Sequence, residues 1–293
     1  PERVVAPCAH FPACGGCRFQ DLAYSAQLAA KQQWVADSLQ RLAGLADAPL
    51  EEIVPAVEQF GYRNKLEYTF SNYRWFTKEE IGNDSEIVDR NALGYHIPGR
   101  FDKVFDAEEC WLQPAPSDAI RNFIRAYAKE NQLGFYDIRG HHGWLRTLTI
   151  RTTTTGETMV LLSFGHEDEA PRTALLAAIQ QAFPEITSLL WCINPKKNDT
   201  IWDLDIRVFH GRDHIIEELR DEGHPPLRFR IGAKSFFQTN PEQTQAMYEL
   251  VRELAGLTGT EKVYDLYCGA GSISLFLARQ CKEVIGAEIV PES

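Results

Sequence analysis

Residues 262–290, KVYDLYCGAGSISLFLARQCKEVIGAEIV, decide the fold of the C-terminal part of the chain. A short apolar strand leads into a turn that contains Gly269 and Gly271. A helix is expected over residues 272–280 and a second strand over residues 283–290. Strand, glycine turn, helix and strand form the opening unit of a doubly wound nucleotide-binding domain.

The quoted unit supplies two strands, whereas an open doubly wound sheet contains about five or six. A parallel pair with a free edge and uncovered faces is not expected to be stable alone. We therefore interpret residues 226–293 as the beginning of a Rossmann-like α/β domain that is truncated and continues beyond Ser293.

The turn carries acids that indicate its ligand. An NAD-binding fingerprint has a third glycine where this chain has Ser274. Asp265 precedes the turn, and Glu288 ends the second strand, where a carboxylate can accept hydrogen bonds from both ribose hydroxyls. This pattern suits the amino-acid and adenosine ends of S-adenosylmethionine. The alternative is an ordinary strand–turn–helix in which Asp265 caps the helix and Glu288 is solvated.

Outward from this unit, Thr239, Asn240 and Pro241 open a further helix, with proline in its first turn. The character of the chain changes after Pro225 and Pro226. Residues 49–225 alternate between strand-like and helical patterns, which predicts a mixed α+β domain. The fold class is therefore a central α+β domain joined to the start of a doubly wound, Rossmann-like α/β domain.

Within residues 49–225, Ser117 is a good N-cap for one of the helices. A loop rich in Asn, Asp and Glu is expected over residues 78–91. Helices are expected over residues 118–131 and 171–182. Strands are expected over residues 62–70 (YRNKLEYTF), 93–96, 101–105, 144–152, 158–164, 189–194 and 203–210.

Residues 1–48 combine a cysteine cluster, Cys8, Cys14 and Cys17, with an amphipathic helix that begins near Tyr24 and closes near Gly44. Clustered thiolates in a chain of this size indicate a metal site more than a disulfide scaffold. The residues themselves leave zinc and an iron–sulfur cluster open. A redox Cys-x-x-Cys pair and buried, unreactive cysteines are the other interpretations.

Composition limits the remaining possibilities. The chain has 293 residues, 44% of them hydrophobic and 24% charged, which is typical of a globular protein with two domains. No stretch approaches the roughly 20 apolar residues that span a bilayer, so we expect a cytoplasmic protein without a membrane partner. The net charge of −11 argues against nucleic acid, but residues 138–156 are locally basic and leave a basic face possible.

Two segments identify a family. DLYCGAGSISL (265–275) resembles the first cofactor motif of the RNA 5-methyluridine methyltransferases, the family of the bacterial 23S rRNA and tRNA uracil-5 enzymes. KSFFQTNPEQ (234–243) resembles the segment that precedes it. The resemblance implies S-adenosylmethionine as cofactor. It implies contacts from the residues that match the motif, together with the acid before the turn: Gln238, Asp265, Tyr267, Gly269, Gly271, Ser272 and Glu288.

The cysteine loop resembles the same family. CAHFPACGGCRFQ (8–20) is similar to its iron–sulfur loop, and FDAEECWLQP (105–114) is similar to the segment that carries its fourth ligand. The resemblance therefore implies a [4Fe–4S] cluster on Cys8, Cys14, Cys17 and Cys110. Its role would be structural or RNA-positioning rather than redox, because methyl transfer from this cofactor moves no net electrons.

The family's reaction needs a thiolate that adds to C6 of uracil and a base that later removes the C5 proton. Cys192, Cys268 and Cys281 lie outside any segment that resembles the family's catalytic Ser-Cys-Asn-Pro stretch. We expect the nucleophile and the base beyond Ser293, so no catalytic residue is assigned here and residues 1–293 alone should not turn over. The β-barrel module that often precedes the cluster is not visible.

The expected function is methylation of C5 of a uridine in RNA, with 23S rRNA as the first substrate and tRNA as the second. The alternatives are a metal-containing RNA-binding protein with a vestigial cofactor fold and a methyltransferase acting on another acceptor. A monomer is the default. Cationic and aromatic side chains are the candidates for contact with RNA: Arg63, Lys65, His96, Arg100, Arg146, Arg151 and Phe237. The alternative for each of them is an ordinary solvated charge or a core aromatic, which is the commoner case.

Overall fold

The computed structural model describes residues 2–82, 89–221 and 223–289. Its strands are β1 Lys65–Ser71, β2 Ala92–His96, β3 Val104–Asp106, β4 Leu145–Thr152, β5 Thr158–Phe164, β6 Ser188–Ile193, β7 Arg207–Gly211, β8 His214–Asp221, β9 His224–Gly232, β10 Lys262–Leu266 and β11 Glu283–Ala287. Its helices are α1 Tyr24–Asp37, the π-helical turn η1 Ser38–Leu42, α2 Lys78–Gly82, α3 Ser117–Glu130, α4 Glu169–Ala182, α5 Pro241–Ala255, α6 Ser272–Leu277 and the 3₁₀ turn η2 Ala278–Gln280.

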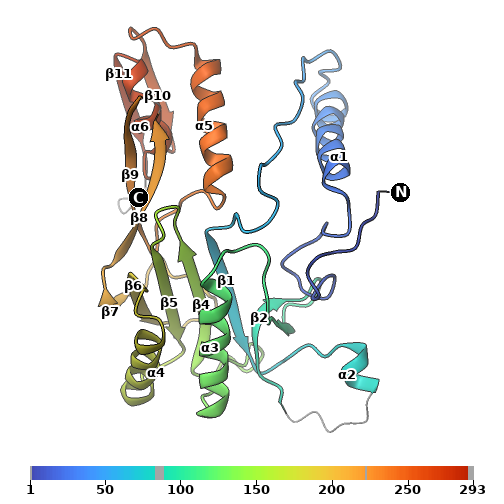
Figure 1. Ribbon diagram of the computed structural model, residues 1–293, viewed down its shortest axis with the longest axis vertical. Coiled ribbons are helices and arrows are strands. Elements are labelled where there is room, and N and C mark those ends of the chain that lie inside the picture. Colours follow the sequence, from blue (N-terminus) through green and yellow to red (C-terminus); the bar gives the residue numbers. More distant parts are fainter. Residues whose placement is uncertain (1, 83–88, 222, 290–293) are drawn as a thin grey trace.

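Seven strands form one sheet in the order β3-β2-β1-β4-β5-β6-β7, and helices α3 and α4 lie on one of its faces (Figure 1). The core on that face joins apolar residues of both helices, Ile120, Ile124, Leu175 and Ile179, to strand residues. Neighbouring strands are antiparallel except β5 and β6, which are parallel and connected by α4. The expected central α+β architecture is therefore present.

The alternation of buried and exposed side chains shows which face of β1 packs into the core. Leu66, Tyr68 and Phe70 are buried, whereas Glu67 between them is exposed. Because side chains point to opposite faces in turn, this pattern directs one face of β1 into the helix-covered core. Strand β5 has no exposed residue, as expected of a strand that is covered on both faces. Both strands were predicted from the sequence.

A hairpin that the sequence analysis did not predict covers the second face of the sheet. Strands β8 and β9 pair antiparallel. Their buried residues Ile215, Leu219, Phe229 and Ile231 pack with Met159, Leu161 and Leu190 of β5 and β6. Pro225 and Pro226, where the chain was expected to change character, lie in β9. β9 has β8 as its strand partner, and prolines are tolerated in such edge strands. The domain boundary at 225/226 stays a prediction.

Ser117 does not cap α3, which corrects the sequence-based expectation. The helix includes Ser117 as its first residue, and Pro116 occupies the cap position without a side-chain hydrogen bond. The Ser117 hydroxyl is fully buried and donates instead to the Gln113 side-chain oxygen. A buried hydroxyl needs a hydrogen-bond partner inside the core. Because the Ser117 hydroxyl finds that partner in Gln113, it is not available to cap the helix.

The N-terminal helix forms where it was predicted, but it does not bury its apolar side chains. No residue of α1 is buried, and Trp34 is 56% exposed. Figure 1 shows α1 standing to one side of the sheet. Cys8 is the one buried residue between residues 2 and 60, all of which the structure describes. The first segment of the chain therefore attaches to the rest around its cysteines.

Short helical structure occupies part of the loop expected over residues 78–91, because α2 covers Lys78–Gly82. Residues 83–88 of that loop lie outside the described residues. In the part of the chain that the structure describes, no helix is both long and apolar enough to cross a membrane.

Replacing Glu217 with Gln should stabilise the protein at neutral pH. Glu217 is buried in β8, and burial raises the pKa of its carboxyl above the usual value. Its Oε1 accepts from the Thr154 backbone, but Oε2 is buried without a partner among the described residues. A raised carboxyl pKa means that stability falls as pH rises above the unfolded value of 4.5.

Removing that charge should add about 1 kcal/mol to the free energy of unfolding. Thermal unfolding of Glu217→Gln and wild type should therefore give a higher midpoint for the variant at pH 7 and converging midpoints toward pH 4.5. Equal midpoints across this range would show that Glu217 carries no buried charge.

Candidate cofactor turn and cysteine cavity

The predicted glycine turn follows β10 and leads into α6, after which the chain returns in the parallel strand β11. β10 pairs with β11, and Asp265 stands opposite Gly286 in the ladder. Glu288 follows the end of β11, and its Oε2 accepts from the Gly269 backbone N–H at 2.9 Å. Both predicted acids therefore come to the carboxyl ends of adjacent parallel strands, which is where open α/β sheets bind their ligands.

Tyr267 has the least ordinary backbone of the turn. Its φ is 64°, a left-handed conformation that a bulky residue rarely adopts. Its N–H donates to the Ala287 carbonyl at 2.8 Å, and the residue is 88% exposed. Gly269 and Gly271 follow with φ values of 53° and 70°. Strained backbone held by neighbouring strands is typical of functional sites.

The turn is braced by two residues that the sequence analysis did not single out. Asp265 Oδ2 accepts from the Ser274 backbone N–H at 3.1 Å and from its hydroxyl at 2.6 Å. The Ser272 hydroxyl lies 2.7 Å from the Tyr248 hydroxyl of α5. Asp265 thus holds the first turn of α6, as the alternative interpretation had it. Its contact with a cofactor stays a prediction.

Cys268 packs beneath the turn. A Cβ built on Gly286 would lie 2.9 Å from the Cys268 sulfur, so a side chain at position 286 would collide with it. Only glycine leaves room for this approach. Cys268 therefore has a packing role beneath the turn.

Gln238 lies beside the central sheet. Its backbone carbonyl accepts from the Asn64 amide at 2.9 Å. The neighbouring Phe237 is buried in a cluster that also contains Tyr248 and Phe276 of the turn region. Phe237 was a candidate for stacking on RNA, but its ring fills that core, as the alternative interpretation had it. Phe236 is the exposed aromatic, with 69% of its surface accessible.

Cys8, Cys14, Cys17 and Cys110 line one cavity, although Cys110 is distant in sequence. The Tyr95 hydroxyl lies 3.7 Å from the Cys110 sulfur. Gly15 allows the loop to dock, because a Cβ there would lie 1.9 Å from the His96 carbonyl oxygen. Among the described residues, no group of three or more His, Cys, Asp or Glu side chains is arranged to hold a metal ion.

Burial governs the charge state of these thiols. Desolvation raises the pKa of Cys14 to about 11 and also raises those of Cys8 and Cys17. The thiols are therefore protonated at neutral pH in this structure, and a cation that bound them would displace their protons.

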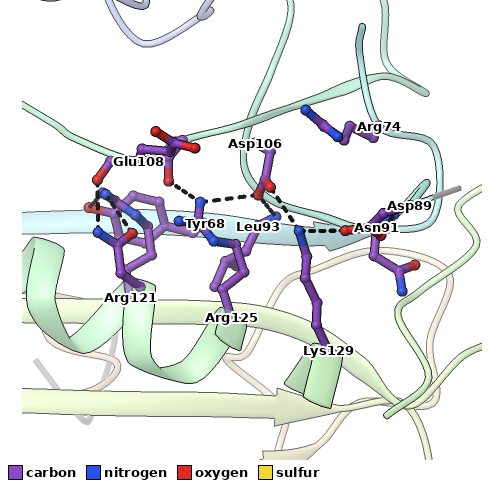
Figure 2. Close-up of polar contacts among 12 residues, drawn as sticks. Tyr68, Arg74, Asp89, Asn91, Leu93, Asp106, Glu108, Arg121, Arg125 and Lys129 are labelled. Carbon is purple, nitrogen blue, oxygen red and sulfur yellow. Dashed lines mark hydrogen bonds and ion pairs between the residues drawn. The ribbon is translucent and has the colours of Figure 1, made fainter. Parts of the chain in front are cut away.

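Helix α3 directs Arg121, Arg125 and Lys129 toward the segment that contains Asp106 and Glu108, shortly before Cys110 (Figure 2). The Asp118 carboxylate accepts from the Cys110 backbone N–H at 2.8 Å and pairs with buried Arg121 at 2.6 Å. Further along the same face, Arg125 donates to the Ala107 carbonyl at 2.7 Å, and Lys129 contacts Asp106 at 3.0 Å. Cys110 is thus positioned by a rigid helix of the sheet domain.

Several candidates for RNA contact are structural. Arg146 is buried and donates to the carbonyls of Asn194, Lys196 and Asn198. Arg151 is buried and donates to the Ser235 carbonyl at 2.7 Å. These two arginines were candidates for RNA contact, but their guanidinium groups are used in hydrogen bonds to the backbone of neighbouring loops.

The other candidates keep some exposure. Arg63 and Lys65 lie at the start of β1, where Lys65 pairs with Glu67. Arg100 is exposed and His96 is half-buried. Burial lowers the pKa of His96, so its ring is neutral at physiological pH.

Comparison with known proteins finds a matching family model and two similar bacterial proteins. Residues 204–293 match the profile of the tRNA (Uracil-5-)-methyltransferase family. The chain is 49% identical over 297 residues to a Bacteroides thetaiotaomicron protein described as an uncharacterized RNA methyltransferase, covering 100% of this chain and 64% of that protein. A Porphyromonas gingivalis protein with the same description is 50% identical over 299 residues, covering 100% and 63%.

A solved structure agrees with these relatives. The Pyrococcus abyssi tRNA (uracil-54, C5)-methyltransferase in complex with S-adenosyl-L-homocysteine superimposes with a TM-score of 0.68 and 25% identity, covering 94% of this chain and 59% of that one. The chain thus spans less than two thirds of each of these proteins. The chain is thus similar to named RNA methyltransferases along its whole length, and to the tRNA (Uracil-5-)-methyltransferase model over residues 204–293.

Proposed function

We propose that this chain belongs to an enzyme that transfers a methyl group from S-adenosylmethionine to C5 of a uridine in RNA. The observation that carries the proposal is the turn between β10 and β11. There an exposed Tyr267 is held in a left-handed conformation beside Glu288. The Pyrococcus abyssi enzyme is in complex with S-adenosyl-L-homocysteine, which is what S-adenosylmethionine becomes after methyl transfer.

The cofactor would be held by the predicted set of turn residues. S-adenosylmethionine supplies the electrophilic methyl group when it is bound. We assign the exposed Tyr267 ring to cover the cofactor and Glu288 to accept from its ribose hydroxyls. Ser272, Gly269 and Gly271 would face its methionine end. Asp265 and Gln238 complete the proposed set.

We place the nucleophile outside residues 1–293, because each cysteine here has another role. Four line the N-terminal cavity. Cys192 is fully buried against the Ser163 hydroxyl, and burial raises its pKa. Cys268 packs against Gly286, and the Cys281 thiol donates to the Leu277 carbonyl at 3.5 Å. Attack of a thiolate on C6 of uracil would need a group that none of these provides.

The cavity suits the proposed [4Fe–4S] cluster by its donor chemistry. Four thiols from two distant segments face one space that is lined mainly by apolar atoms. The thiols alone suit zinc as well as a cluster, and the likeness of residues 8–20 and 105–114 to the family's iron–sulfur segments favours the cluster. When bound, it would tie the N-terminal segment to the sheet.

We propose 23S rRNA as the substrate, because the family members that this cysteine pattern resembles act mainly there. tRNA is the second candidate, since the Pyrococcus abyssi relative is named as a tRNA enzyme.

The proposal is tested by incubating the intact protein with methyl-labelled S-adenosylmethionine and unmodified 23S rRNA or tRNA in separate reactions. Digestion should release label as 5-methyluridine from one of the two RNAs. Label in another nucleoside would change the reaction class. No label, from protein shown by calorimetry to bind S-adenosyl-L-homocysteine, would favour a non-catalytic RNA-binding protein or another acceptor.

A further inference from the structure

A cavity of about 210 Å³ lies where β1 ends and β3 begins, and it shares no lining residue with the cysteine cavity. It is lined by two aromatic side chains, one amide and three cations, with no carboxylate among them: Asn72, Tyr73, Arg74, Phe76, Arg90 and Lys103. This concentration of positive charge is unusual in a chain whose net charge is −11.

The walls of the cavity are fixed by backbone hydrogen bonds. The Trp75 N–H donates to the Val104 carbonyl at 2.7 Å, and the Val104 N–H donates to the Tyr73 carbonyl at 3.2 Å. The Arg74 N–H donates to the Arg90 carbonyl at 3.0 Å. The lining residues therefore come from three segments that are tied together before any ligand binds.

Two of the cations are available to a ligand. Three acidic side chains near the cavity have cationic partners, in the pairs Glu80 with Arg74, Asp102 with Arg139 and Asp89 with Lys129. A fourth, Asp137, accepts from the Asn72 side-chain amide at 3.3 Å. Arg90 and Lys103 enter no ion pair among the residues that the structure describes. Lys103 instead lies with its ammonium 5.4 Å from the centre of the Tyr73 ring.

Two polar atoms of the lining residues also lack partners within the described part of the chain. Asn72 Oδ1 is a buried acceptor and Arg74 Nε a buried donor. Buried polar groups without partners are costly, and each one calls for an explanation. A ligand with both a hydroxyl donor and anionic oxygens would satisfy both atoms and the two free cations.

We propose that this cavity binds one nucleotide of single-stranded RNA. A phosphodiester would lie between Arg90 and Lys103, and the neighbouring 2′-hydroxyl would donate to Asn72. RNA offers this combination of phosphate and 2′-hydroxyl, which DNA lacks. The proposal rests on the proposed function in that it takes RNA to be the substrate.

The position of the cavity makes it a secondary site. Asn64, just before β1, contacts the Gln238 carbonyl, whereas the cavity lies at the opposite end of the strand. A strand of this length spans roughly 20 Å. The bound nucleotide therefore flanks the reacting uridine at a distance, and the site anchors RNA without contacting the chemistry.

The test compares the double variant Arg90→Ala/Lys103→Ala with Lys282→Ala, which removes an exposed lysine before β11. Affinity of the intact protein for 23S rRNA and tRNA transcripts is measured across a series of salt concentrations. The double variant should bind about tenfold more weakly. Its plot of log affinity against log salt should be shallower by about 0.7 for the lost phosphate contact. Lys282→Ala should match wild type.

Both outcomes can be separated from the proposed function by assaying 5-methyluridine on the same preparations. Equal affinity and equal salt slope for the double variant and wild type would overturn the site, even if methylation is normal. If the double variant bound RNA more weakly while wild type itself made no 5-methyluridine, the site would be sustained and the proposed reaction overturned.

Discussion

Gly15→Ala should abolish binding of the proposed iron–sulfur cluster, whereas Gly16→Ala should preserve it. A Cβ at position 15 would lie 1.9 Å from the His96 carbonyl oxygen, so the loop would have to leave the end of β2. A Cβ at position 16 meets its nearest atoms at 3.6 Å, which is ordinary contact. Because Cys14 and Cys17 flank these glycines, moving the loop would take their thiols away from Cys110.

The measurement is iron and acid-labile sulfide in anaerobically purified protein, with Cys110→Ser as the reference for complete loss. Wild type and Gly16→Ala should carry about four irons per chain, and Gly15→Ala close to none. Thermal unfolding should remain cooperative in all variants, since the loop lies outside the sheet core. Full iron in Cys110→Ser, or zinc in place of iron in wild type, would refute the cluster.

Gly286→Ala should weaken cofactor binding, and removing the sulfur beneath it should restore the affinity. The new methyl group would lie 2.9 Å from the Cys268 sulfur and would push the turn away from β11. Overpacking of this kind costs about 1–3 kcal/mol. We expect the affinity for S-adenosyl-L-homocysteine, measured by calorimetry, to fall about tenfold.

Cys268→Ala alone should bind the cofactor like wild type, and the double variant Gly286→Ala/Cys268→Ala should recover most of the lost affinity. Such non-additivity is the signature of two groups in direct contact. If Cys268→Ala bound the cofactor normally but formed no 5-methyluridine, Cys268 would have a chemical role and our placement of the nucleophile would be wrong.

Helices and strands whose order of apolar and polar residues matches their burial could be predicted from the sequence. Alternation identified β1, and an apolar run identified β5, because each strand's burial follows its side-chain period. The turn was predicted because Gly269 and Gly271 take left-handed conformations that glycine adopts freely. The meeting of Cys110 with the N-terminal cysteines came from family resemblance, since spacing alone cannot bring such distant residues together.

Features set by tertiary packing were missed. Phe236 and Phe237 are neighbours of the same kind, and a shift of one residue decides which ring enters the core. Arg146 and Arg151 lie in a locally basic strand, which is typical of RNA-binding surfaces, but their guanidinium groups donate to backbone carbonyls of the protein itself. The β8–β9 hairpin was not predicted, because Pro225 and Pro226 usually interrupt a strand. Here they lie in a strand with an unpaired edge, which accommodates proline.

The near absence of buried residues from the first segment has a consequence for how the protein matures. Cys8 is the one buried residue between residues 2 and 60, whereas Cys110 is held by α3 through Asp118. The sheet domain can therefore fold with one ligand in place, while the other three remain on a tether. Cluster delivery would then be a late assembly step that closes the tether, and oxidative loss of the cluster would reopen it to proteases while the sheet stays folded.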